Sequence, residues 1–135
     1  MQVQRSETVL IRFPEDVVAA RQVVRREAVA VGFSLVDQTK IVTATSELAR
    51  NALVYGGGGT VEVSVIQQDF RVGLQVDFVD QGPGIADVER ALQDGYTSGQ
   101  GMGLGLGGAK RLSHEFSIET EVGRGTRVTI VRWKG

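Results

Sequence analysis

Glu47 and Asn51 are the two residues whose types and spacing best suit metal and proton chemistry. They stand four positions apart in a stretch with a helical pattern, so their side chains project from the same side of a helix, one turn apart. An asparagine oxygen is a suitable ligand for Mg²⁺, and a neighbouring carboxylate can orient a hydroxyl group or take its proton. A solvated polar helix face that also carries Arg50 is the alternative, and the pair alone does not decide between the two.

Asp80 is a second candidate because it continues the alternation of Val76 and Phe78 at the end of a predicted strand. Its carboxylate should therefore point to the core face, where a charged group needs a partner. Gly82 and Gly84 follow it and leave a slot whose floor is backbone. A base amine that donates to this carboxylate would gain roughly 1.5 to 3 kcal/mol. A turn aspartate bonded to its own backbone is the alternative.

The glycine-rich stretch from Gly99 to Gly108 is the third candidate. Backbone N–H groups in such a stretch, together with the N-terminus of the helix predicted after it, can bind phosphate groups. The stretch therefore favours a nucleotide ligand, and a plain loop or helix cap is the alternative. Gly103, Gly105 and Gly108 also form a GxGxxG pattern, but this pattern follows a polar loop rather than a strand. A dinucleotide-binding fold is therefore not supported, and no Gly-Lys-Ser/Thr sequence of a P-loop occurs.

The spacing of apolar residues predicts the elements that must position these candidates. Residues 3–13 alternate as a strand, and helical spacing follows until Gly32 ends the first helix. A second helix, with Asp37 as its N-cap, is predicted to run to about Val54, where the glycines at 56–59 require a loop. The residues predicted to form its apolar stripe are Ile41, Thr45, Leu48 and Ala52.

The second half of the chain predicts two hairpins and two helices. In order, the elements are a hairpin of strands at 61–65 and 72–78, a short helix at 87–93, a helix from about Leu104 to His114, and a hairpin that turns at 123–125. The polar segment from Asp94 to Met102 has no apolar period to anchor it and is predicted to be a mobile lid that tightens on a nucleotide. Thr126 is predicted to join Asp80 as a polar residue on an apolar face.

This order of elements predicts an α/β (α+β) fold built as a two-layer sandwich. Its sheet is expected to be mixed but mostly antiparallel, with the helices packed on one face and the other face exposed. A chain of 135 residues, of which 41% are hydrophobic, is long enough for one domain with its own core. We therefore expect a single domain that spans residues 1–135.

Charge and composition exclude several classes of function. The net charge is −1 and no dense basic run occurs, so neither a nucleic-acid surface nor a membrane-binding patch is expected. The chain has no cysteine, which removes disulfides and thiol chemistry and is compatible with a reducing compartment. No signal peptide or membrane-spanning run is recognisable. These features predict a cytoplasmic protein.

Three short motifs, taken together, resemble the three conserved boxes of the GHKL ATPase superfamily. They are SELARN at 46–51, DQGPGI at 80–85 and GQGMGLGL at 99–106, in the same order and with similar spacing. The resemblance implies the GHKL (Bergerat) ATP-binding fold, with ATP and Mg²⁺ as cofactors. It implies that Glu47 is the catalytic base, that Asn51 is the Mg²⁺ ligand, and that Asp80 recognises the adenine amine with support from Thr126. The nucleotide-binding residues that it implies are Asn51, Asp80, Gly82, Gly84, Ile85, Gly101, Met102, Gly103, Leu104, Gly105, Leu106 and Thr126.

Nearly the whole chain is also similar to the anti-sigma-factor-type serine/threonine kinases, and most similar to the RsbT-like switch kinases of the stressosome. This similarity implies a protein kinase that phosphorylates STAS-domain scaffold proteins of the RsbS and RsbR kind. Such a kinase then activates a PP2C-type phosphatase of the RsbU kind. It also implies a monomer or weak dimer, and a partner contact through Arg21, for which a plain surface helix is the alternative. A nucleotide-gated binding module with little or no kinase activity is the alternative function.

Overall fold

A computed structural model describes residues 1–92 and 105–135 of the chain. The described elements, in order, are β1 (Gln2–Ile11), α1 (Pro14–Val31), α2 (Leu35–Val54), β2 (Gly59–Gln68), β3 (Arg71–Asp80), α3 (Val88–Ala91), α4 (Leu106–Arg111), β4 (Glu115–Glu121) and β5 (Gly125–Trp133). The strands lie in the order β1-β2-β3-β5-β4. Each pairing between described strands is antiparallel, so the sheet that was expected to be mixed has no parallel pair in this part of the chain.

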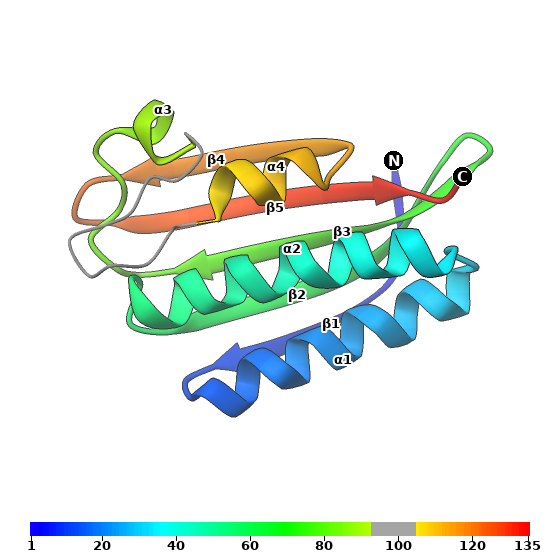
Figure 1. Cartoon of the computed structure of the whole chain (residues 1–135), viewed down its shortest axis with the longest axis horizontal. Coiled ribbons are helices and arrows are strands. Elements are labelled where there is room, and N and C mark those ends of the chain that lie inside the picture. The colour runs from blue at the N-terminus through cyan, green and yellow to red at the C-terminus, as the bar shows by residue number, and fades with distance from the viewer. Residues whose placement is uncertain (93–104) are drawn as a thin grey trace.

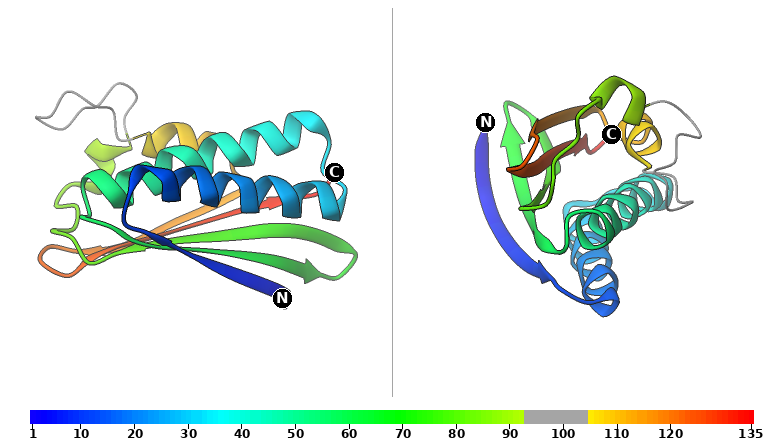
Figure 2. Two further views of the ribbon diagram at one scale, coloured as in Figure 1. Left: turned by 90° about the horizontal axis from the view of Figure 1, so that it is seen from below. Right: turned by 90° about the vertical axis from the view of Figure 1, so that its left-hand side faces the viewer.

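The molecule has two layers, with α1, α2 and α4 on one face of the sheet (Figures 1 and 2). The core lies between these layers, because the strands turn their alternate valines toward the apolar faces of the helices. Ile41 and Leu48 of α2 are buried there, as the predicted stripe requires, together with Val61 of β2 and Ile130 of β5. The predicted two-layer sandwich with helices on one face is therefore confirmed.

Strand register brings the two predicted polar residues of the core face together. Asp80, the last residue of β3, pairs with Gly59 of β2 on one side and with Thr126 of β5 on the other. Phe78, two positions earlier on the same face, is buried. The alternation seen in the sequence therefore placed Asp80 and Thr126 correctly, on the helix side of the sheet at one end.

The start of α2 differs from the sequence prediction. Its N-cap is Ser34, whose hydroxyl oxygen accepts a hydrogen bond from the N–H of Asp37 at 3.1 Å. Asp37 lies in the first turn, where its carboxylate accepts a hydrogen bond from the guanidinium of Arg132 at 2.6 Å. The prediction of Asp37 as the N-cap was wrong, because Ser34, three residues earlier, caps the helix and Asp37 lies within its first turn.

α4 is shorter than predicted at its C-terminal end, and the predicted start at Leu104 lies outside the described residues. The helix ends at Arg111, and the N–H of His114 donates to the carbonyl of Val131 at 2.9 Å. His114 therefore belongs to the edge of the β4–β5 hairpin rather than to the helix. Among the described residues, no helix is both long and apolar enough to cross a membrane.

Candidate functional site

A pocket of about 540 Å³, including its open mouth, lies at the end of β3 and next to the C-terminal half of α2. The turn after β3, the start of α4 and the first half of β5 complete its walls. The residues that line it are Leu48, Asn51, Ala52, Tyr55, Gly56, Phe78, Asp80, Pro83, Gly84, Ile85, Leu106, Thr126 and Val128. The pocket is therefore mostly apolar, with a few polar side chains that converge on it, as is common for small-molecule sites.

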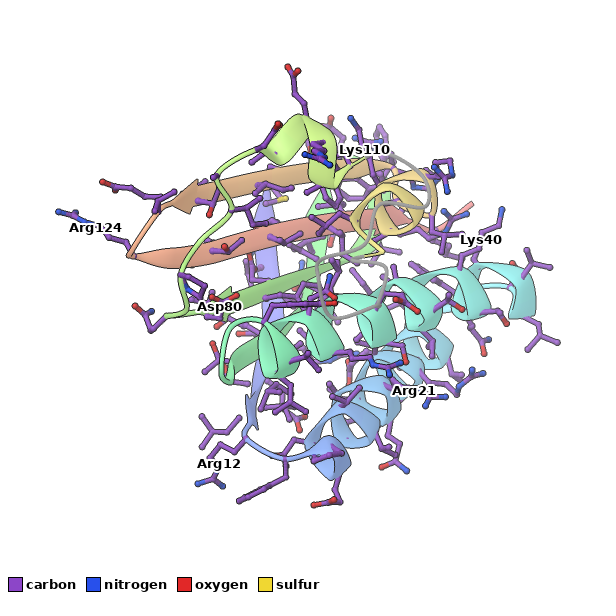
Figure 3. The ribbon with its side chains drawn as sticks, turned by 60° about the vertical axis from the view of Figure 1, so that its left-hand side comes forward. Arg12, Arg21, Lys40, Asp80, Lys110 and Arg124 are labelled. Atoms are coloured by element: carbon purple, nitrogen blue, oxygen red, sulfur yellow. The ribbon has the colours of Figure 1, made fainter. Side chains whose placement is uncertain are left out.

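Asp80 is the charged group of this pocket. Its side chain lies at the end of β3, beside the C-terminal part of α2 (Figure 3). Atom Oδ1 accepts a hydrogen bond from the N–H of Gly82 at 2.9 Å. Burial raises the pKa of the Asp80 carboxyl above its ordinary value, and the hydrogen bond from Gly82 partly offsets this shift. The backbone N–H of Thr126 acts on the pKa in the same direction as that of Gly82. A carboxylate oxygen has two lone pairs, so a partly buried carboxylate with backbone donors can still accept a hydrogen bond from a ligand.

Gly56 and Gly82 allow the backbone to approach Asp80 closely. A Cβ atom on Gly56 would lie 2.4 Å from Cγ of Asp80, and one on Gly82 would lie 2.6 Å from the Cα of Gly56. Both contacts are shorter than any that real Cβ atoms make, so a side chain at either position would displace the carboxylate or the turn. Gly82 was predicted to shape this slot. Gly56 was interpreted only as a loop residue, and the run of four glycines was the signal that could have identified it.

Thr126 belongs to a hydroxyl network at the side of the pocket. Its hydroxyl lies 2.9 Å from that of Thr120, which accepts from the N–H of Ile85 at 2.9 Å and donates to the carbonyl of Gly125 at 3.0 Å. Since the single proton of Thr120 goes to Gly125, Thr126 donates to Thr120 and presents its lone pairs as acceptors. Thr120 was predicted only as a strand residue, and its role in holding Ile85 and Thr126 was missed.

Glu47 and Asn51 lie on the side of α2 that faces this site. Asn51 lines the pocket. Glu47 lies against the start of α4, where a Cβ atom on Gly105 would come 2.6 Å from its Oε2 atom. Gly105 is the N-cap of α4 and has a left-handed φ of 68°, which glycine adopts without strain. The predicted pairing of a carboxylate and an amide at one site is therefore consistent with the geometry.

The structure does not bring every predicted site residue into this pocket. Ile85, Gly84 and Leu106 line it as predicted. The predicted residues Gly101, Met102, Gly103 and Leu104, and the lid predicted over residues 94–102, lie outside the described residues. Arg21 is exposed on α1 and does not line the pocket (Figure 3).

The residues present fit a purine nucleotide with a divalent cation. The backbone approaches Asp80 closely at Gly56 and Gly82, and Asp80 and Thr126 offer acceptors to a base amine. Asn51 and Glu47 supply the amide and carboxylate oxygens that Mg²⁺ prefers. No cluster of three or more His, Asp or Glu side chains that could hold a metal alone occurs in the part of the chain that the structure describes.

Comparisons with known proteins agree with this arrangement. The sequence profile of the histidine kinase-, DNA gyrase B-, and HSP90-like ATPase family matches residues 36–134. The serine/threonine-protein kinase RsbT of Bacillus subtilis is 43% identical over 118 residues, which cover 87% of this chain and 89% of that protein. The anti-sigma F factor of Geobacillus stearothermophilus is 36% identical over 99 residues, which cover 68% of this chain and 66% of that protein.

Solved structures show the same fold at low sequence identity. The RsbU and RsbW domains of a Mycobacterium tuberculosis protein superpose with a TM-score of 0.64 at 21% identity. This match covers 98% of the present chain but only 33% of the other chain. The catalytic domain of the histidine kinase ThkA superposes with a TM-score of 0.54 at 16% identity, and the match covers 95% of this chain and 96% of that one.

Proposed function

This chain belongs to the family of histidine kinase-, DNA gyrase B- and HSP90-like ATPases, and we propose that it is an ATP- and Mg²⁺-dependent protein serine/threonine kinase. The proposed kinase domain comprises residues 1–135, and its proposed location is the cytoplasm. The relative named serine/threonine-protein kinase RsbT supports the activity, because its similarity extends over nearly the full length of both chains.

The observation that supports this proposal is that Asn51, Asp80 and Thr126 line one pocket, while Glu47 lies one helical turn from Asn51. Asp80 and Thr126, from neighbouring strands, lie where a base can be recognised. Asn51 lines the same pocket, and Glu47, one turn earlier on α2, lies against Gly105 at the start of α4. A protein that only sequestered a nucleotide would need Asp80 and Thr126 and not a further carboxylate.

The proposed roles follow from the chemistry of each side chain. Mg-ATP, when bound, supplies the phosphoryl group and the positive charge that offsets its negative charge. Glu47 would take the proton of the acceptor hydroxyl as the new oxygen–phosphorus bond forms and the bond to the ADP oxygen breaks. Asn51 would hold the metal, and Asp80 would fix the base and hence the position of the whole nucleotide. Positioning and electrostatics would supply most of the rate.

We propose STAS-domain scaffold proteins of the RsbS and RsbR kind as the substrates, and a PP2C-type phosphatase of the RsbU kind as the protein activated afterwards. The similarity to RsbT supports this assignment. The matched Mycobacterium tuberculosis chain, which contains an RsbU and an RsbW domain together, is compatible with it. Arg21, which is exposed on α1 outside the pocket, is the proposed partner contact.

A nucleotide-gated binding module is the second candidate function. The observation that favours it is the similarity to a protein named anti-sigma F factor, a name that describes binding to another protein. In this case nucleotide would control the affinity for a partner, and little or no phosphate would be transferred.

Phosphoryl transfer from labelled ATP to a purified STAS-domain protein tests the proposal and separates the two candidates. Glu47→Gln should retain ATP binding but lose roughly 10²- to 10⁴-fold in transfer rate, as is typical when a general base is removed. Asn51→Ala should weaken Mg²⁺-dependent ATP binding as well as transfer, because Mg²⁺ takes few protein ligands. Glu15→Gln, the same change at an exposed position of α1, is the control and should alter neither.

Two results would contradict the kinase assignment. If Glu47→Gln transfers phosphate at the wild-type rate, Glu47 is not the base. If the wild type transfers none to any STAS-domain protein but binds one only in the presence of nucleotide, the binding module is the better description.

A further inference from the structure

Thr120 lies on β4 directly opposite Thr126 of β5, and it is not among the described residues that line the pocket. Its hydroxyl is nevertheless bonded to two residues that do line it. It accepts a hydrogen bond from the N–H of Ile85, in the segment after β3, and it lies 2.9 Å from the hydroxyl of Thr126. A residue in this position can act on a ligand only through its neighbours.

The hydrogen bonds of Thr120 use the full capacity of its hydroxyl group. A hydroxyl has one proton and two lone pairs. The N–H of Ile85 can only donate, so it occupies one lone pair of Thr120. The carbonyl of Gly125, 3.0 Å away, can only accept, so it takes the proton. The second lone pair remains for Thr126, whose own proton must therefore point toward Thr120.

The carbonyl of Gly125 is itself held in place. It belongs to the same peptide group as the N–H of Thr126, and in a trans peptide the two point in opposite directions. This N–H donates to the carboxylate of Asp80, so the carbonyl is directed toward β4. Gly125 is also closely packed, because a Cβ atom there would lie 2.1 Å from the carbonyl oxygen of Asp80. The proton of Thr120 therefore stays with Gly125, and that of Thr126 stays with Thr120.

The fixed proton of Thr126 decides what this part of the pocket can offer a ligand. With its proton directed to Thr120, the Thr126 hydroxyl presents only lone pairs to the pocket. The ionised carboxylate of Asp80, the neighbouring pocket residue on β3, also only accepts. Two adjacent acceptors complement an amine. A Thr126 hydroxyl that could rotate freely would donate as readily as it accepts, and this preference for a donor would be weaker.

We propose that Thr120 is a positioning residue that makes the pocket selective for purine nucleotides with an amine at position 6. It acts by fixing the proton of Thr126 and does not itself contact the base. The inference rests on the proposed function, because it takes a purine nucleotide as the ligand. It assigns part of the selectivity for the base to a side chain outside the pocket.

Calorimetric titration with ATP and with purine riboside 5′-triphosphate, which carries hydrogen in place of the 6-amine, tests the proposal. The quantity compared is the Kd for purine riboside triphosphate divided by the Kd for ATP. Thr120→Val frees the proton of Thr126 to turn into the pocket, so this ratio should fall roughly 2- to 12-fold, the range for one net hydrogen bond. Thr120→Ser keeps the hydroxyl and should keep the wild-type ratio. Thr8→Val, the same change at an exposed position of β1, is the control and should also keep it.

A purely structural role for Thr120 predicts a different result. If Thr120 only braced the backbone at Ile85, Thr120→Val would weaken both triphosphates by the same factor and leave the ratio unchanged. A double-mutant comparison separates the two roles further. In a Thr126→Val protein the hydroxyl through which Thr120 acts is absent, so the addition of Thr120→Val should leave the ratio of that protein unchanged.

The proposal is overturned if the wild type binds both triphosphates equally, or if folded Thr120→Val keeps the wild-type ratio. It is also overturned if Thr120→Val lowers the ratio equally with and without Thr126→Val. Should the valine variant not fold, Thr120→Cys provides the same test, because a thiol is only a weak donor and acceptor, and a wild-type ratio would again overturn the proposal. A wild type that binds neither triphosphate would refute the proposed function and this inference with it, whereas ATP binding with an unchanged ratio would refute this inference alone.

Discussion

Replacing Asp80 with asparagine tests the ligand assignment, because this side chain lines the pocket and one of its oxygens is held by a backbone N–H group. One carboxylate oxygen accepts the N–H of Gly82 at 2.9 Å. An asparagine preserves this bond only by placing its amide oxygen there, which puts its NH₂ group where the second carboxylate oxygen stood. The exocyclic amine of adenine is also a donor, so in the variant two donors would face each other.

The expected loss of affinity follows from the kind of bond removed. A hydrogen bond to a charged acceptor contributes about 1.5 to 3 kcal/mol, so the Kd for ATP should rise about 10- to 150-fold. The stability of the fold should not decrease. Burial raises the pKa of the Asp80 carboxyl, which means that the buried position disfavours its charge, and asparagine removes that charge. The Tm of Asp80→Asn should therefore equal or exceed that of the wild type.

Isothermal titration calorimetry with ATP and with GTP is the appropriate measurement. GTP carries a carbonyl oxygen where ATP carries the amine, so Asp80→Asn should lose less affinity for GTP, or gain some. Asp77→Asn is the matched control, since it is the same change on the same strand. Its carboxylate lies on the other face and accepts from Thr129 at 2.6 Å and from Gln75 at 3.0 Å. Unchanged ATP affinity in a folded Asp80→Asn protein would refute the assignment of Asp80 to base recognition.

Three further predictions concern the surroundings of the site and the stability of the fold. Gly56→Ala should weaken ATP binding at least tenfold in calorimetry, because its methyl group would overlap the carboxylate of Asp80. Gly57→Ala is the control: its methyl group would lie in open space, so this variant should bind ATP normally despite some backbone strain. Asp37→Asn should lower the free energy of unfolding by about 3 kcal/mol near neutral pH, because Arg132 stays buried without its partner. The ion pair lowers the pKa of Asp37, so its contribution to the free energy of unfolding is complete above the ordinary pKa of 3.8 and is lost as the pH falls through the lower folded-state pKa. In denaturant unfolding, the difference in stability between wild type and Asp37→Asn should therefore disappear in that pH range. A difference that stays constant with pH would contradict this origin. Limited proteolysis at residues 94–102 should be slower with Mg-ATP than without it, and equal cutting would count against phosphate capture by this segment.

The sequence by itself determined the strands, the two long helices and the inward orientation of the Asp80 side chain. Apolar periods of two and of about 3.6 residues are local properties, and they predicted the strands and the two long helices correctly. The same local rule predicted that Asp80 faces inward, because side chains alternate along a strand whatever lies around it. Glu47 and Asn51 were placed on one side of α2 by their spacing alone.

Only the tertiary structure decided how these elements meet. Gly56 follows α2 and Asp80 ends β3, and their close approach depends on how the helix packs across the sheet. Thr120 became the centre of a hydroxyl network because the register of β4 against β5 brings it beside Thr126. Asp37 forms an ion pair with Arg132, a residue 95 positions later. Contacts of this kind form between residues that no short-range pattern connects, since burial and hydrogen bonding are satisfied only once the layers are packed.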